Sequence, residues 1–276
     1  MILHYMLLCP CRQLHTPTNL LLLSLAVSDF FVGLVVTPLQ VYRQTSCWYL
    51  GNRICSLQGY VSFSIISASI GGMVLISADR YAAICDPLHY STRVTVSRVK
   101  KCVCLCWLCT FMYNMIIFRH EFIQSGRLNF CFGMCLVGIE TITATVDFAL
   151  TFVVPFSCII FLYMRVFLTA VSQARAMRSH VAAVTLHHSG TKRSELKAAR
   201  TLGLVVAWFL ICFCPYYCFT LLPHIIPAVS GVFLLCLSPF LNPVIYALFY
   251  PWFRKALRLI FSLQILQPGS RETNVL

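Results

Sequence analysis

Long apolar stretches separated by short polar segments run through the whole of this 276-residue chain. The stretches lie near residues 20–42, 54–79, 102–118, 143–167, 201–222 and 229–250. All but the stretch at 102–118 exceed the roughly 20 residues that a helix needs to cross the hydrocarbon core of a bilayer. Because backbone polar groups in lipid need partners within their own segment, we expect six complete membrane-spanning helices.

A seventh span is expected in incomplete form at the N-terminus. Residues 1–9 are apolar but too short to cross a bilayer, and they lack the positive n-region of a signal peptide. We interpret them as the inner end of a first helix whose start is missing. After the last span, residues 251–262 predict a short amphipathic helix and 263–276 a tail. The expected fold class is all-α: one polytopic membrane domain over residues 1–276, a seven-helix bundle with helix 1 truncated.

Composition and charge support a membrane protein and set its orientation. With 59% hydrophobic and 11% charged residues, the chain is not a soluble domain. Although the net charge is +13, 17 of the 21 Lys and Arg lie in segments 10–19, 80–101, 165–200 and 251–276. This alternation is the positive-inside pattern, so these segments are expected to face the cytoplasm. The basic residues therefore indicate contact with lipid headgroups, and nucleic acid is not an expected partner.

The side chains that carry enzyme chemistry are not arranged for it. Most of the 16 cysteines lie within spans, where Cys behaves as a small apolar residue, so no metal site is expected. No catalytic triad, carboxylate pair or phosphate-binding glycine loop is present, so we do not expect an enzyme. On the outer side, Cys55 opens the third span, and Cys131 and Cys135 lie in the loop before the fifth. A disulfide from Cys55 to that loop is plausible in an oxidising environment.

Two short motifs occur toward the cytoplasmic ends of the third and the last span. Asp79-Arg80-Tyr81 closes the third, and Asn242-Pro243-Val244-Ile245-Tyr246 lies inside the last. Further short strings occur at intervals along the chain. Together with the two motifs and in their order along the chain, they resemble the rhodopsin-like (class A) G-protein-coupled receptors over the whole chain except the missing first helix. The further strings are Leu25 to Asp29, Trp48, Cys55, Trp107, Pro155, Tyr163, Phe209 and Cys212 to Pro215.

Three longer strings narrow the resemblance. Residues 15–19, 86–90 and 247–255 are similar to the trace amine-associated receptors, and the chain looks like their fish members. That family consists mostly of olfactory receptors for volatile amines. The resemblance implies a multi-pass plasma-membrane protein, located in olfactory cilia, with a small amine ligand and a stimulatory G protein (Gs/Golf-type) as partners. It also implies that Cys135 is the partner of Cys55, which would leave Cys131 and Cys47 over.

The resemblance assigns the two motifs to activation. Arg80 would pair at rest with Asp79 and with Glu195, and this would hold helices three and six together. Pro243 interrupts the last helix because it has no amide hydrogen, and the freed carbonyl is expected to need a partner from Asn242, Asp29 or water. Tyr163 and Tyr246 would swing toward Arg80, the residue before Tyr81, in the active state. Asp29, an ionisable group deep in the second span, would take part in a sodium and water site; no other cofactor is expected.

Asp147 is the strongest candidate for a ligand contact. It lies eight residues before Pro155, about two helical turns toward the outside, and so at ligand depth. A carboxylate there can bind an ammonium group through charge-assisted hydrogen bonds. The family's usual amine-binding Asp lies eighteen residues before Arg80, where this chain has Ser62. Because some fish members carry the acid on helix five instead, we expect the amine at Asp147.

Other pocket positions also depart from the family pattern. The usual Trp of the sixth span is Phe213, and the usual Tyr of the seventh is Cys236. Tyr216, Tyr217 and Phe63 remain as aromatic walls able to give cation–π contact. Helix packing alone accounts for these aromatic residues almost equally well.

We therefore predict a receptor that couples binding of an extracellular amine to a stimulatory G protein and cAMP. One alternative is a receptor of the same fold for a non-amine ligand, although Asp147 argues against an anion. Another is a truncated remnant that no longer signals. A transporter or channel would show repeat symmetry or a polar path through several spans, and neither is visible.

Overall fold

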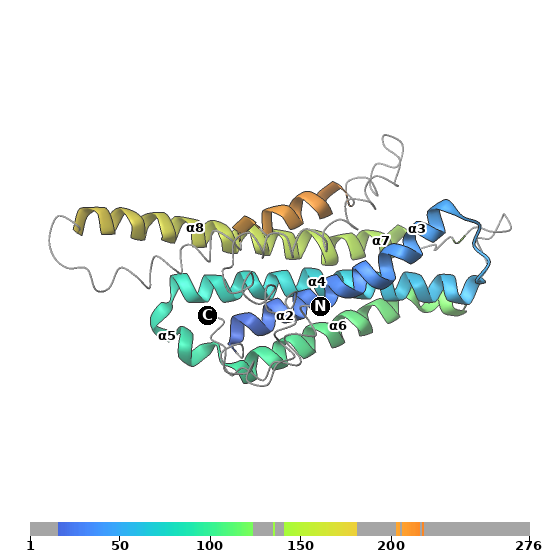
Figure 1. Cartoon of the computed structure of the whole chain (residues 1–276), viewed down its shortest axis with the longest axis horizontal. Helices are drawn as coiled ribbons and strands as arrows, with labels where there is room; N and C mark the ends of the chain where they lie inside the picture. Colours follow the sequence, from blue (N-terminus) through green and yellow to red (C-terminus); the bar gives the residue numbers. More distant parts are fainter. Residues whose placement is uncertain are drawn as a thin grey trace, which may run out of the picture.

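The computed structural model of the chain describes residues 16–123, 135, 141–180, 203–204, 206–215 and 217. Its elements are all helices, with no strand among the described residues, so the all-α prediction is confirmed (Figure 1). They are α2 (Pro17–Phe31), η2 (Val32–Val36), α3 (Thr37–Thr45), α4 (Asn52–Cys85), α5 (Pro87–Arg93), α6 (Val96–Ile123), α7 (Thr141–Phe148), η3 (Ala149–Val153) and α8 (Val154–His180). A shorter apolar helix, Val206–Pro215, follows.

Four of the helical segments are long and apolar enough to cross a membrane. They are Pro17–Thr45, Asn52–Cys85, Val96–Ile123 and Ile142–Gln173. Each extends past the apolar stretch that predicted it, because a helix continues into the headgroup region where polar residues are tolerated. The predicted span at 201–222 is described only in part. The spans at 1–9 and 229–250, the amphipathic helix at 251–262 and the tail lie outside the described residues.

Helix α4 is the centre of the described bundle. It contacts α2, α6 and α8, and Figure 1 shows it running between α6 and α8. The N-terminus of α2 is well defined. Thr16 caps it by accepting a hydrogen bond from the Asn19 amide at 3.3 Å, and Pro17 occupies the first turn. Such a cap and a Pro at this position are both typical of a helix start. All the polar clusters described below include or adjoin α4.

Two spans contain a π-helical turn just before a proline. The turn η2 precedes Pro38, and η3 precedes Pro155. A proline inside a helix lacks an amide hydrogen and its ring clashes with the carbonyl four residues back. A wider turn relieves this conflict, and π-turns often occur at functional sites. Directly after η2, the hydroxyl of Thr37, the first residue of α3, donates to the Val32 carbonyl at 2.9 Å.

The core and the lipid-facing surface are both apolar. The largest buried cluster of the described residues joins α2, α4, α6, α8 and the helix at 206–215; it comprises Leu21, Leu22, Leu25, Ile70, Met73, Ile76, Val99, Phe156, Ile159, Val206, Phe209, Cys212 and Phe213. On α6, by contrast, Leu105, Leu108, Met112 and Ile116 form an exposed stripe at helical spacing. Such a stripe is expected where the surrounding solvent is lipid.

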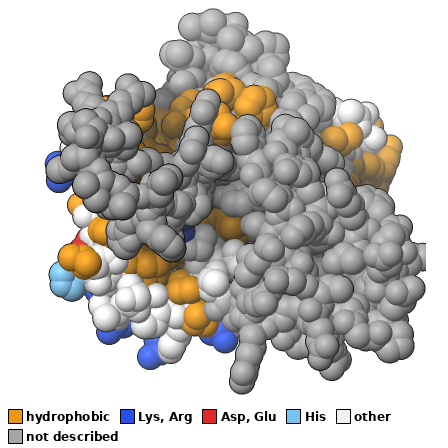
Figure 2. All heavy atoms as spheres, turned by 60° about the vertical axis from the view of Figure 1, so that its left-hand side comes forward, with side chains coloured by type: hydrophobic (Ala, Val, Ile, Leu, Met, Phe, Trp, Pro, Cys, Tyr) orange, Lys and Arg blue, Asp and Glu red, His pale blue; other side chains and the backbone are white. Residues whose placement is uncertain are grey.

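The two ends of the bundle differ in charge. The end at α5 carries the exposed Arg93, Arg98, Lys100 and Lys101. Figure 2, in which this end comes forward, shows Lys and Arg side chains along the rim. This arrangement agrees with a cytoplasmic α5 end and an extracellular opposite end, as the charge pattern predicted.

Candidate functional site

A buried carboxylate lies in the outer half of the bundle. Asp147, near the end of α7, is only 8% exposed and accepts a hydrogen bond from the Tyr113 hydroxyl of α6 at 3.0 Å. One turn later, the Thr151 hydroxyl of η3 donates to the Asp147 backbone carbonyl at 2.7 Å. No Lys, Arg or His among the described residues forms an ion pair with this carboxylate. We name Asp147, Tyr113 and Thr151 the outer acid site.

Aromatic side chains continue inward from the outer acid site. The Tyr217 ring stacks on Phe152 with centroids 4.4 Å apart, and its hydroxyl lies 3.4 Å from that of Thr151. Phe152 then contacts Phe156 at 4.4 Å. In the helix at 206–215, Phe209 stacks on Phe213 at 4.0 Å and on Phe156 at 5.9 Å. Tyr217 and Phe213 are thus joined to the outer acid site by one aromatic column.

Ser62 belongs to a neutral polar cluster. It is buried on α4 and accepts a hydrogen bond from the Gln58 amide at 3.4 Å, and the same amide donates to Gln40 of α3 at 3.4 Å. The Gln58 carbonyl oxygen is buried and has no hydrogen-bond partner among the described residues. Phe63, next along the chain, makes an edge contact with Phe118 of α6 at 5.5 Å.

A second buried carboxylate lies at the cytoplasmic end. Asp79 forms an ion pair with Arg80, and the Arg80 Nε lies 3.1 Å from Asp79 Oδ2. Asp79 also accepts hydrogen bonds from the Thr18 hydroxyl of α2 at 2.9 Å and the Tyr90 hydroxyl of α5 at 2.8 Å. Arg80 donates to Thr18 as well. Burial raises the pKa of Tyr90, so its phenol stays a donor. We name Thr18, Asp79, Arg80 and Tyr90 the inner lock.

Two other predicted switch residues, Tyr81 and Tyr163, lie in the described part of the chain. Tyr81 packs against Ile84 and Val166, which joins α4 to α8. Tyr163 borders the main core cluster, and its ring would lie 3.7 Å from a Cβ added at Gly203. Asp29 is buried in α2, three residues before the start of η2. The sodium site at Asp29 stays a prediction.

A disulfide closes the extracellular end. Cys55, at the start of α4, is bonded to Cys135, 80 residues later, with 5.6 Å between their Cα atoms. Both pack with the buried Trp48. Arg43 donates to the Cys135 carbonyl at 2.8 Å, which ties the loop before α7 to α3. Cys47 is free and exposed, whereas Cys131 lies outside the described residues.

Comparison with known proteins identifies the family. Residues 2–246 match the family of 7 transmembrane receptors of the rhodopsin type. Trace amine-associated receptor 8a of Rattus norvegicus is 34% identical over 94% of this chain and 80% of its own length. Trace amine-associated receptor 13c of Danio rerio is 34% identical over 96% and 82%, and receptor 1 of Mus musculus is 33% identical over 96% and 84%. The chain belongs to the trace amine-associated receptors.

Membership fixes the broad function. The protein is a multi-pass receptor of the plasma membrane and not an enzyme, and its partners are a small-molecule ligand and a heterotrimeric G protein. The family match covers residues 2–246, so both the outer acid site and the inner lock lie within the matched region.

Several predicted site residues of the receptor lie outside the described part of the chain. They are Tyr216 and Cys236 of the expected pocket, and Glu195, Asn242, Pro243 and Tyr246 of the expected switch. Their roles stay predictions.

Four polar residues at these sites were not assigned a role from the sequence. Tyr113 and Gln58 contact Asp147 and Ser62, and Thr18 and Tyr90 contact Asp79. A Tyr one helix away from an intramembrane Asp is a weak signal by itself. Thr18 and Tyr90 each lie in a string that carried the family resemblance, which could have marked them for closer inspection.

Proposed function

We propose that this receptor binds an extracellular amine through Asp147 and responds by activating a stimulatory G protein, which raises cAMP in olfactory neurons. The observation that carries the proposal is the carboxylate of Asp147, buried at ligand depth without a cation from the described residues. A buried carboxylate is costly unless it is paired. A ligand ammonium would supply the missing charge. The names of the receptors to which the chain is similar support an amine.

The surroundings of Asp147 suit an ammonium ion. Tyr113 occupies one carboxylate oxygen, Oδ1, and so holds the group in one orientation. Among the described residues no other donor occupies the second oxygen, which can accept from a ligand. The rings of Phe148, Phe152 and Tyr217 lie on the same side of the bundle and can add cation–π attraction. Ser62 and Gln58 form a separate polar cluster on α4 that contains only neutral hydrogen-bonding groups.

Signal transmission is a shift between two populations of the bundle. An amine raises activity only if it binds the active arrangement more tightly than the resting one. The aromatic column from Tyr217 to Phe213 connects the amine to the helix at 206–215. The inner lock neutralises Arg80 in the resting arrangement, and release of Arg80 would expose a cation to the G protein. The stimulatory type of G protein rests on the resemblance.

The test is amine-evoked cAMP in cells that display the tagged chain at their surface. Members of a panel of monoamines and diamines should raise cAMP in the parent receptor, and the same concentrations should not do so in Asp147→Asn, which keeps the shape and loses the charge. An Asp147→Glu variant, which keeps the charge, should retain a weakened response. If the parent and both variants reach the surface and stay silent, the amine ligand is wrong. If amines bind at the surface without a cAMP rise, the stimulatory coupling is wrong.

A further inference from the structure

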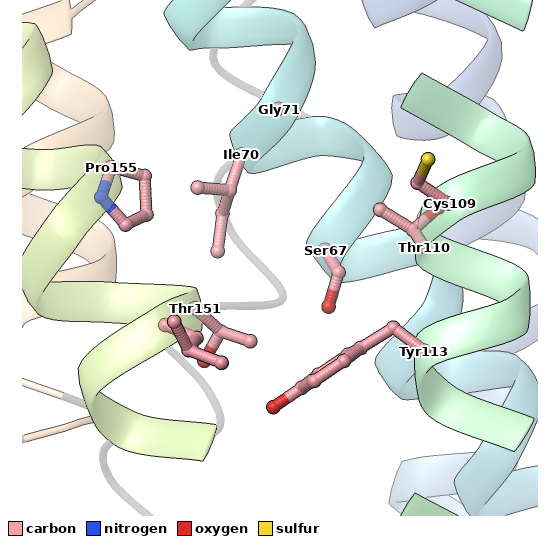
Figure 3. A pocket seen from close by; sticks show the side chains of 9 residues that line it. Ser67, Ile70, Gly71, Cys109, Thr110, Tyr113, Thr151 and Pro155 are labelled. Atoms are coloured by element: carbon pink, nitrogen blue, oxygen red, sulfur yellow. The ribbon is translucent and has the colours of Figure 1, made fainter. Parts of the chain in front are cut away.

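A cavity of about 290 Å³ lies between α4, α6 and the η3–α8 segment, next to the outer acid site. Each of these three segments contributes three lining residues. Ser67, Tyr113 and Thr151 supply hydroxyl groups, and Cys109 and Leu150 are among the apolar groups. Figure 3 shows the hydroxyls of Ser67 and Tyr113 directed into the space that separates α4 and α6 from η3.

Two residues that line the cavity also form hydrogen bonds with Asp147. Tyr113 lines it with its ring and donates its hydroxyl to the Asp147 carboxylate at 3.0 Å. Thr151 lines it from η3 and donates to the Asp147 carbonyl at 2.7 Å. The π-turn η3 places Leu150 and Thr151 at the cavity within one turn of the acid. A molecule bound at Asp147 can therefore extend into this space beside the Tyr113 ring.

The lining determines which chemical group the cavity suits. It contains no charged residue, so a second ammonium would be buried there without a counter-ion. The Thr110 and Thr151 hydroxyls donate to backbone carbonyls at 2.8 and 2.7 Å. The Ser67 hydroxyl has no hydrogen-bond partner among the described residues. Cys109 and Leu150 are exposed to the lipid side, so the cavity opens toward the bilayer and favours apolar contents.

We propose that this cavity receives the hydrocarbon body of the amine whose ammonium is held by Asp147, and that it makes the receptor selective for monoamines with a compact apolar body. This inference rests on the proposed function. The volume lies just below the range of roughly 300–1,000 Å³ that is typical of pockets for drug-sized ligands. A small aliphatic or aromatic monoamine fits that space, and a diamine of the same length does not suit its lining.

The test is the cAMP response to a series of straight-chain primary amines that starts at methylamine. In the parent receptor each added methylene should lower the EC50 about fourfold until the cavity is full. Two variants fill the cavity from different helices: Ser67→Leu from α4 and Cys109→Phe from α6. In both, the gain should stop at a shorter chain, and the EC50 of the longer amines should rise about tenfold or more. Methylamine should keep its parent EC50.

Matched controls separate filling of the cavity from other effects. Leu108→Phe places the same ring on the lipid-facing stripe of α6, outside the cavity, and Ser67→Ala removes the hydroxyl without adding volume. Both should keep the full chain-length gain. Methylamine activity and surface display report on folding. A gain that persists in both filled variants, or that Leu108→Phe abolishes equally, overturns the cavity assignment.

The outcomes distinguish the two proposals. If amines act through Asp147 but ignore filling of the cavity, only the cavity assignment fails. If Asp147→Asn responds like the parent, the proposed function fails and the assignment falls with it. A photoreactive monoamine with a diazirine at the end of its chain gives an independent readout. It should label peptides from α6 and from the η3–α8 segment, whereas labelling confined to α3 and the outer half of α4, near Gln40 and Gln58, would contradict the assignment.

Discussion

The outer acid site and the inner lock both contain a buried Asp and a Tyr that hydrogen-bonds to it, but they differ in whether a cation is present. Each has a buried Asp that accepts a hydrogen bond from a Tyr hydroxyl of another helix, at 3.0 Å for Asp147 and 2.8 Å for Asp79. Asp79 also has a cation beside it, Arg80, whereas no cation of the described residues pairs with Asp147. Since a buried charge needs a counter-charge, the inner site is complete and the outer one can bind a cation.

This difference assigns opposite roles to two similar carboxylates. Breaking a complete pair releases a charge, which is what a switch requires. Completing an unpaired site binds a cation, which is what a receptor for an amine requires. The comparison leads to predictions that can be tested with paired substitutions of the same chemical type.

The largest difference is expected between Asp147→Asn and Asp79→Asn. Removing one partner of a buried ion pair costs roughly 2–5 kcal/mol, so Asp147→Asn should raise the amine EC50 by about 30-fold or more and leave basal cAMP unchanged. Asp79→Asn should raise basal cAMP instead, because Arg80 loses its partner in the resting arrangement. Basal and amine-evoked cAMP, normalised to surface display, measure both. Equal effects of the two variants on basal activity would refute the assignment of roles.

A new acid at Ser62 should create a second cation site. In Ser62→Asp the carboxylate would replace a hydroxyl that now accepts from Gln58, and it would have no cation among the described residues. We expect the potency of diamines to rise about tenfold, while monoamines of equal length gain little. Ser62→Asn, which has the same shape without the charge, is the control. A diamine response that is equal in Ser62→Asn and Ser62→Asp would show that charge is not the cause.

The two tyrosines should give a smaller, matched pair of effects. A hydrogen bond to a charged group contributes roughly 1.5–3 kcal/mol when buried, and both phenols here are only partly buried. Tyr113→Phe should therefore raise the amine EC50 by about tenfold or less, because the Asp147 carboxylate is no longer held in one orientation. Tyr90→Phe should raise basal cAMP modestly without a comparable change in EC50. If Tyr113→Phe raised basal cAMP and Tyr90→Phe raised the amine EC50 instead, the roles assigned to the two sites would be wrong.

The sequence predicted the elements better than the contacts between them. Long apolar stretches predict membrane helices because length and hydropathy are enough. The rotation of each helix is harder, since lipid and core are both apolar. On α6, Leu108 and Met112 face lipid while Phe118 is buried, and nothing in their apolar character separates them.

The site shows the same division. The position of Asp147 two turns before Pro155 could be predicted from chain distance alone, and the Cys55–Cys135 disulfide from the family resemblance. The contact of Tyr113 with Asp147 could not, because it depends on the relative rotation of α6 and α7. The π-turns before Pro38 and Pro155 were also missed, although a proline in the interior of each span signalled a local change of helix geometry.

The smallest effect is expected from pH at the inner lock. Burial raises the pKa of Tyr90, so its contribution to stability is complete below the ordinary Tyr value of about 10 and is lost only as the pH rises through the folded value. A hydrogen bond with His89 lowers the pKa of Asp86. The stability that ionised Asp86 contributes is therefore lost only as the pH falls through its folded-state pKa, which lies below about 3.9.

Neither of these windows includes the pH of the cytoplasm, and His89 contacts the exposed Asp86 rather than Asp79. Basal cAMP should therefore stay constant when the internal pH of ionophore-clamped cells is varied between about 6.5 and 7.5. Asp86→Asn should behave like the parent, whereas Tyr90→Phe should have a higher basal level at every pH. A basal level that follows internal pH, and stops doing so in His89→Gln, would mean that the lock extends to Asp86 and His89. The inner site would then be a proton-sensitive switch, and its contrast with the outer acid site would need a third charged group.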